Sequence, residues 1–295
     1  MDTTLPDVEL VPAGDGTPLA LIRWAPPAGA SRGTILIVHG LGEHAGRYGQ
    51  VALRLIADGW EVAAYDHRGH GRSGGARGGL RRPADLLRDL ATVIDLVRAT
   101  TAPSALGQHQ PFLLLGHSMG GLVAAQFVAR AMRPVDGLIL SSPALDAGLS
   151  LVKRIQLAIG HTFLPDVALS NQLDADRISH DASVVRAYRA DPLVHDRVTA
   201  RLARALVDGG KEVLERAPTW HVSTLLLWAG ADALVSPAGS AAFAAAAPGA
   251  LVRARCFDGL YHEIFNEVDV EPVFTELTGW LGERFPAVPD RAPTA

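Results

Sequence analysis

The sequence has one cysteine, no long apolar run and no basic N-terminal region, and each shortage excludes a class of protein. Cys256 has no partner for an intramolecular disulfide, and no Cys/His cluster has the spacing of structural zinc. The apolar segments are far shorter than the roughly 18 residues that a membrane-spanning helix requires. The acidic N-terminus contains Pro6 and lacks the basic and apolar regions of an export signal. We therefore expect a cytoplasmic protein.

The chain also lacks an excess of positive charge. The chain has 27 Lys and Arg against 31 Asp and Glu, a net charge of −4, so it lacks the basic excess that binds nucleic acid through phosphates. Hydrophobic residues make up 48% of the chain, which excludes wholesale disorder. A length of 295 residues fits one large domain, or one domain with an insertion.

Short apolar segments alternate with helical patterns over most of the chain. An N-terminal hairpin is predicted at 8–25, and the later segments read as buried strands; they lie at 34–40, 60–67, 111–118, 135–143, 223–232 and 252–259. Helices are predicted between them, at about 46–58, 83–99, 119–132, 238–247 and 268–285. This α/β alternation predicts a mostly parallel sheet of about eight strands with helices on both faces.

The alternation stops between about residues 144 and 216, where helical patterns continue without a clear buried strand. We interpret 144–216 as a helical cap inserted into a core that comprises 1–143 and 217–286. The Pro- and Ala-rich residues 287–295 are predicted to form a flexible tail.

The strongest chemical signal is Gly-His-Ser-Met-Gly at 116–120, which matches G-x-S-x-G. It lies between a predicted strand and a predicted helix, the context of a nucleophile elbow. The serine of such an elbow sits on a strained turn, which requires small neighbours, and the helix N-terminus points at the reacting carbonyl. This pattern predicts Ser118 as the nucleophile.

A serine hydroxyl needs a base, and in the α/β-hydrolase fold the acid and the histidine follow the serine in that order. His262 follows the last predicted strand, so we assign it as the base. Asp232 ends the preceding strand and is our choice of acid; Asp146, one strand earlier, is the alternative. The remaining downstream histidines lie in or next to the predicted cap: His161, His180, His195 and His221.

An acyl-transfer site also needs two backbone N–H groups for the developing oxyanion. Met119, directly after the nucleophile, is predicted to supply one. The His-Gly-Leu-Gly segment at 39–42 permits close backbone approach after a strand, which makes Leu41 the predicted second donor.

Two other patterns point to cofactors, and we reject both. Residues 69–74 match G-x-G-x-x-G, and Asp89 follows at the spacing of a dinucleotide site, but no helix is predicted to begin within the motif. The pairs His39 and His44, or His67 and His70, lack the carboxylates and spacing of a metal site. We therefore expect no cofactor and no metal.

The chain resembles the monoacylglycerol lipase and lysophospholipase branch of the α/β-hydrolases. The resemblance lies in seven segments, at 39–48, 65–75, 113–121, 138–145, 188–194, 225–235 and 261–267. It implies a catalytic triad of Ser118, Asp232 and His262, with oxyanion donors at Leu41 and Met119. It also implies substrate contacts at the polar end of the site from Glu43 and Arg47, and from Tyr188 near the leaving alcohol.

The function that follows is hydrolysis of a carboxylic ester, with a monoacylglycerol as the expected substrate and an acyl-enzyme on Ser118. A lysophospholipase or a general carboxylesterase is the first alternative. An acyltransferase, a peptidase and a non-catalytic ligand-binding relative stay open because a fold does not fix the acceptor. The expected partner is a small lipid ester, with transient membrane or micelle contact through the apolar cap and no nucleic acid.

Overall fold

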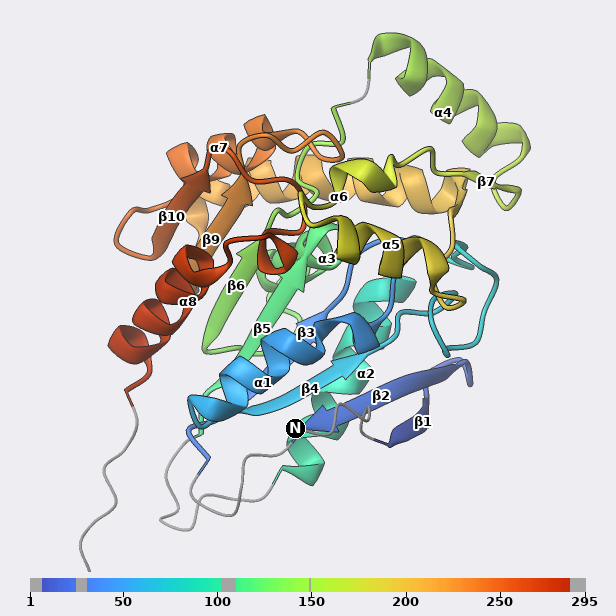
Figure 1. The fold of residues 1–295 in the computed structure, drawn as a ribbon. Coiled ribbons are helices and arrows are strands. Elements are labelled where there is room, and N and C mark those ends of the chain that lie inside the picture. The colour runs from blue at the N-terminus through green and yellow to red at the C-terminus, as the bar shows by residue number, and fades with distance from the viewer. Residues whose placement is uncertain (1–6, 25–30, 102–109, 149, 287–295) are drawn as a thin grey trace, which may run out of the picture.

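The computed structural model describes residues 7–24, 31–101, 110–148 and 150–286, and its centre is an eight-stranded sheet (Figure 1). The predicted tail, 287–295, lies outside the described residues. The strand order is β1-β2-β4-β3-β5-β6-β9-β10. β1 and β2 are antiparallel, as are β2 and β4, and the other neighbouring pairs are parallel. The strands are β1 (Val8–Pro12), β2 (Pro18–Trp24), β3 (Thr34–Val38), β4 (Glu61–Tyr65), β5 (Phe112–His117), β6 (Gly137–Ser141), β9 (Ser223–Ala229) and β10 (Val252–Phe257).

Helices cover both faces of the sheet and bury its apolar side chains. One face packs against α1 (Gly49–Ala57) and α8 (Glu271–Arg284), where Leu55 and Trp280 are fully buried. The opposite face packs against α2 (Asp85–Thr100), α3 (Ser118–Ala129) and α7 (Pro237–Ala246). Because both faces are covered, the central strands are mostly apolar, and all five residues of β3 are buried. The predicted α/β-hydrolase fold is confirmed.

The predicted cap range, 144–216, folds over the carboxyl ends of the parallel strands. It contains α4 (Leu151–Phe163), α5 (Ala182–Ala190) and α6 (Ala200–Arg216), with a short 3₁₀ helix, η2 (Ala175–Arg177). It also contains a two-stranded antiparallel sheet that the helical patterns did not predict, β7 (Ala168–Ser170) with β8 (Arg197–Thr199). Strands of only three residues are too short to leave a periodic pattern.

The two halves of the predicted cap differ in their contacts with the core. Backbone hydrogen bonds join its second half to the core, from the His195 N–H to the Gly42 carbonyl (2.8 Å) and from the Thr199 N–H to the Gly78 carbonyl (2.9 Å). By contrast, α4 lies on α6 and away from the sheet (Figure 1). The helices of the described residues include none with the length and apolarity needed to span a bilayer.

Candidate active site

Ser118 lies on the sharp turn where β5 ends and α3 begins. Its φ of 53° is in the left-handed region, a strained backbone for a non-glycine residue and the geometry of a nucleophile elbow. The turn has no space for a side chain two positions before or after Ser118. A Cβ on Gly120 would lie 2.0 Å from the Val38 carbonyl oxygen, and one on Gly116 would lie 2.6 Å from the Gly120 carbonyl oxygen.

His262 and Asp232 come together from two different loops at the carboxyl edge of the sheet. Asp232 follows β9 and His262 follows β10, and their Nδ1 and Oδ2 atoms lie 2.6 Å apart. The other carboxylate oxygen of Asp232 accepts hydrogen bonds from the Leu234 and Val235 N–H groups, at 2.8 and 3.0 Å. Burial opposes ionisation of Asp232, but the His262 hydrogen bond and charge outweigh it, so the pKa of this carboxyl is lowered.

The alternative acid and the other histidines lie elsewhere. Asp146 Oδ1 accepts a hydrogen bond from the Gly148 N–H (2.9 Å), and the carboxylate that pairs with His262 is that of Asp232. His161 lies in α4, and His221 is exposed ahead of β9. His180 pairs with Glu267, with Nδ1 and Oε1 2.9 Å apart.

The segment that follows β3 approaches the nucleophile from the other side. A Cβ on Gly40 would lie 3.2 Å from Cβ of Ser118, so the two backbones are in close contact. The Gly40 N–H donates to Glu43 Oε1 (2.6 Å), while the Leu41 N–H has no acceptor within the described residues. Met119 lies in the first turn of α3, where N–H groups have no partner inside the helix. Leu41 and Met119 therefore stay the predicted oxyanion donors.

Two members of the candidate triad, Ser118 and His262, line a small cavity of about 30 Å³ that residues of the predicted cap range also line. The core contributes Gly40, Leu41, Glu43, His117, Ser118, Leu234, His262 and Glu263, and the cap contributes Leu173, Ala175, Ile178 and Tyr188. This volume is about that of one water molecule in the liquid. An acylglycerol therefore requires the cap side chains over Ser118 to move.

Of the three predicted substrate contacts, Glu43 and Tyr188 line this cavity, and Arg47 lies behind them. Its guanidinium carbon is 4.8 Å from the centre of the Tyr188 ring. Arg47 also binds two carboxylates, those of Glu43 and Glu263. Sequence analysis missed Glu263. The available signal was a charged residue directly after His262, which would be buried and would therefore need a partner.

Burial and charge shift the titration of three residues around the cavity. Burial opposes ionisation of Glu43, but the charge of Arg47, together with the histidines and the Tyr48 hydrogen bond around it, outweighs burial and lowers the pKa of Glu43 to about 2. Burial raises the pKa of Tyr188 to about 12. Burial lowers the pKa of His117 to about 4, so this ring is neutral at neutral pH. It packs 4.7 Å from the His262 ring, centre to centre.

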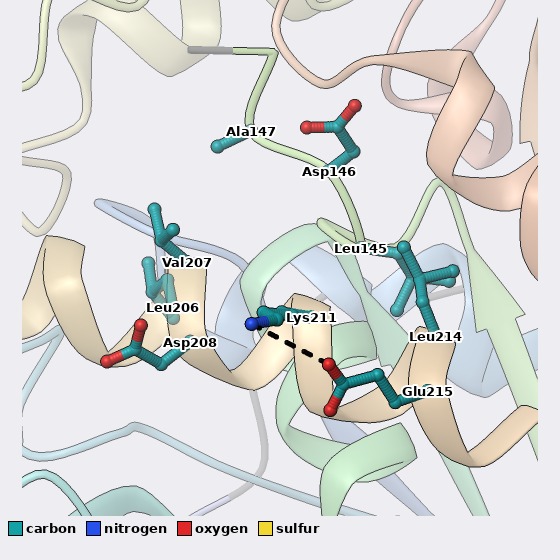
Figure 2. A pocket seen from close by; sticks show the side chains of 9 residues that line it. All are labelled: Leu145, Asp146, Ala147, Leu206, Val207, Asp208, Lys211, Leu214 and Glu215. Atoms are coloured by element: carbon teal, nitrogen blue, oxygen red, sulfur yellow. Dashed lines mark ion pairs between the residues drawn. The ribbon is translucent and has the colours of Figure 1, made fainter. Parts of the chain in front are cut away.

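A larger groove of about 500 Å³ begins where the chain leaves β6 (Figure 2). Its lining residue Leu145 directly follows Ala144, whose N–H donates to the Ser118 carbonyl (2.9 Å). Aliphatic side chains line the groove, and Asp146, Asp208, Lys211 and Glu215 add charge. The aliphatic set is Leu145, Ala147, Leu206, Val207 and Leu214.

The glycine-rich motif at 69–74 forms a turn, and α2 begins only at Asp85. Asp66 holds this turn by accepting from the Arg72 N–H (2.7 Å). Asp89 is buried and pairs with Arg68 through two contacts of 2.6 Å, so it faces no ribose site. His39, His67 and His70 form a cluster of rings, but no group of described His, Cys, Asp and Glu residues has the arrangement of a metal site.

Known proteins resemble the chain over most of its length. The family model described as serine aminopeptidase, S33 (Hydrolase_4) matches residues 29–269. A monoacylglycerol lipase of Mycolicibacterium smegmatis is 37% identical over 261 residues, covering 88% of this chain and 90% of that protein. Phospholipase YtpA of Bacillus subtilis is 30% identical, covering 85% and 95%. The crystal structure of Paleococcus ferrophilus monoacylglycerol lipase is 30% identical, covers 90% and 99%, and has a TM-score of 0.79.

Fold and relatives together define a carboxylic ester hydrolase with the α/β-hydrolase architecture. The chain belongs to the Hydrolase_4 family, in the branch that contains the monoacylglycerol lipases. The resemblance inferred from the seven sequence segments is thereby confirmed.

Proposed function

We propose that this protein hydrolyses monoacylglycerols, with Ser118 as nucleophile, His262 as general base and acid, and Asp232 as the residue that orients His262. The single observation that carries the proposal is the pairing of His262 Nδ1 with Asp232 Oδ2 at 2.6 Å, at the cavity that Ser118 lines. A carboxylate at Nδ1 fixes the tautomer in which Nε2 accepts the serine proton.

The reaction would proceed in two halves. Ser118 attacks the ester carbonyl while His262 takes its proton, and the backbone N–H groups of Leu41 and Met119 stabilise the oxyanion. His262 then protonates the leaving glycerol oxygen. Water, deprotonated by His262, attacks the acyl-enzyme and releases the fatty acid.

The two ends of a monoacyl lipid find different surroundings here. Polar side chains at the small cavity, among them Glu43 and Tyr188, suit a glycerol headgroup. The aliphatic groove beginning at Leu145 suits an acyl chain, and Leu206 and Val207 form part of its wall. We propose that the acyl chain occupies this groove after the cap side chains over Ser118 move.

The cap also carries an exposed apolar stripe along α4. Val152, Ile155, Ile159 and Phe163 recur at helical spacing and are 51–75% exposed. Leu164, Val167 and Leu169 extend this surface toward β7, with exposures of 46–64%. An apolar surface of this kind marks an interaction site, so we propose that it touches membranes or micelles while substrate enters.

A substrate panel tests the proposed function. Monoacylglycerols of increasing chain length, lysophospholipids, p-nitrophenyl esters and aminoacyl anilides would be compared by kcat/KM. The proposal expects monoacylglycerols to be the best substrates and Leu206→Trp to reduce turnover of long chains more than short ones. Preference for lysophospholipids would favour the phospholipase alternative that YtpA suggests. Preference for anilides would favour a peptidase.

A further inference from the structure

A buried ion-pair bridge joins two loops on opposite sides of the candidate active site. We call it the Arg47 bridge; it consists of Glu43, Arg47 and Glu263. Arg47 Nη1 lies 2.7 Å from Glu43 Oε2 and 2.6 Å from Glu263 Oε1, and Arg47 Nη2 lies 2.7 Å from Glu263 Oε2. The side chains of all three are at most 11% exposed.

Each end of the bridge is attached to a chain segment that carries a proposed catalytic group. At one end, Glu43 Oε1 accepts from the Gly40 N–H (2.6 Å), in the residue before Leu41, and from the Tyr48 hydroxyl (2.7 Å). At the other end, Glu263 directly follows His262 in the chain. Arg47 therefore connects the segment of the proposed oxyanion donor with the segment of the proposed base.

The contacts engage both carboxylate oxygens of Glu263. Arg47 occupies both of its carboxylate oxygens, and the Asn266 amide also donates to Oε2 (2.8 Å). The Glu263 N–H donates to the Ile178 carbonyl in the cap (2.8 Å). Its geometry is that of a residue that fixes the backbone around His262.

We propose that Glu263 is a positioning residue that, through Arg47, sets the distance between the His262 loop and the Leu41 oxyanion donor. A bidentate arginine–carboxylate pair suits this task because two parallel hydrogen bonds fix orientation as well as distance. This inference rests on the proposed function, since it assigns a task within that triad and oxyanion hole.

Glu263→Ala and Glu263→Gln test the proposal, with Glu271→Gln as matched control because Glu271 forms an exposed ion pair with Arg54 on the surface. Both Glu263 variants leave the Arg47–Glu43 pair intact, so Arg47 keeps a buried counterion while the formal charge of the bridge changes from −1 to 0. We expect Glu263→Ala to lower kcat about 100-fold with KM nearly unchanged, the loss typical of misplaced reacting groups. Gln, which keeps one of the hydrogen bonds, should restore part of kcat, and the control should equal wild type.

The rate of Ser118 labelling by a fluorophosphonate gives a second readout, which needs no ester substrate and should fall in parallel with kcat. Unchanged kcat in both folded Glu263 variants, or a rise in KM alone, would overturn the positioning role. If Glu263→Ala fails to fold, the Gln variant decides by the same criteria. Wild-type protein that neither labels nor hydrolyses esters would instead refute the proposed function, which is a separate outcome.

Discussion

Asp232 and His262 are 30 residues apart in the chain, yet the carboxylate of one lies 2.6 Å from the imidazole of the other. Their side chains are 3% and 7% exposed, so little water competes for this hydrogen bond. Each follows its own strand, and the parallel pairing of β9 with β10 places the two strand ends side by side. The sheet topology, rather than any local sequence, creates the pair.

We expect Asp232→Asn to lower kcat by about 10⁴-fold, because the amide stabilises the wrong imidazole tautomer while preserving the geometry. Asn can still accept the Leu234 and Val235 N–H bonds, so the fold should survive. Hydrolysis of p-nitrophenyl butyrate, with circular dichroism as a check on folding, measures the effect. Asp146→Asn is the matched control and should keep most activity; the opposite ranking would assign the acid to Asp146.

Gly40→Ala should impair catalysis without unfolding the protein. The added methyl would lie 2.8 Å from Glu43 Oε1 and 3.2 Å from Ser118 Cβ, so the segment that carries the Leu41 N–H must move. Loss of one oxyanion donor typically reduces kcat by about 10²–10³-fold. Gly279→Ala in α8, where a Cβ meets nothing within 4 Å, is the control. Equal kcat for the two variants would contradict the proposed oxyanion segment.

We expect the free energy of unfolding to fall steeply below neutral pH. Burial lowers the pKa of His39, His67, His70 and His117 in the folded protein. An unfolded histidine titrates near pH 6.5, so below that value the unfolded chain binds more protons than the folded one. The free energy of unfolding then decreases by up to about 1.4 kcal/mol per pH unit for each such histidine, until the folded group itself protonates.

Urea unfolding measured between pH 7.5 and 5 tests this account of the buried histidines. His67→Gln should flatten the pH profile, whereas a change at exposed His221 should not. A free energy of unfolding that stays constant across this range would show that the buried imidazoles do not behave as described.

The α4 stripe should matter for aggregated substrates only. Replacing Ile155 and Ile159 with serine should raise the apparent KM for micellar monoacylglycerol and weaken vesicle binding, because apolar area available to the interface is lost. Hydrolysis of a monomeric short-chain ester should not change. Leu10→Ser, at a comparably exposed apolar residue (62%) on β1, is the control. Loss of activity on both substrate types would point to a structural role instead.

The sequence predicted the core of the fold better than the cap. Segments such as 35–38 are apolar at every position because helices cover both faces of the sheet, and that pattern is visible without coordinates. The cap range 144–216 is still a prediction as a domain. Its short β7 and β8 strands pair through backbone atoms, and α4 leaves its apolar stripe exposed, so neither feature follows from core-burial patterns.

The candidate site likewise has residues whose positions the sequence predicted and contacts that it did not predict. Ser118 and His262 could be predicted because motif and strand ends locate them, and Asp232 because an acid ends the preceding strand. The Arg47 bridge could not, since its members lie 4 and 216 residues apart and only the folded chain shows that Arg47 serves two carboxylates. Pairings between distant loops depend on tertiary structure, which local pattern does not encode.

Intact-protein and peptide mass spectrometry after fluorophosphonate treatment, combined with release of fatty acid from a monoacylglycerol, tests the central claim most directly. We predict a single adduct, located on Ser118, and parallel loss of hydrolysis, with Ser118→Ala folded, unlabelled and inactive. Labelling at another residue, or continued hydrolysis by folded Ser118→Ala, would contradict the assignment of Ser118 as the nucleophile.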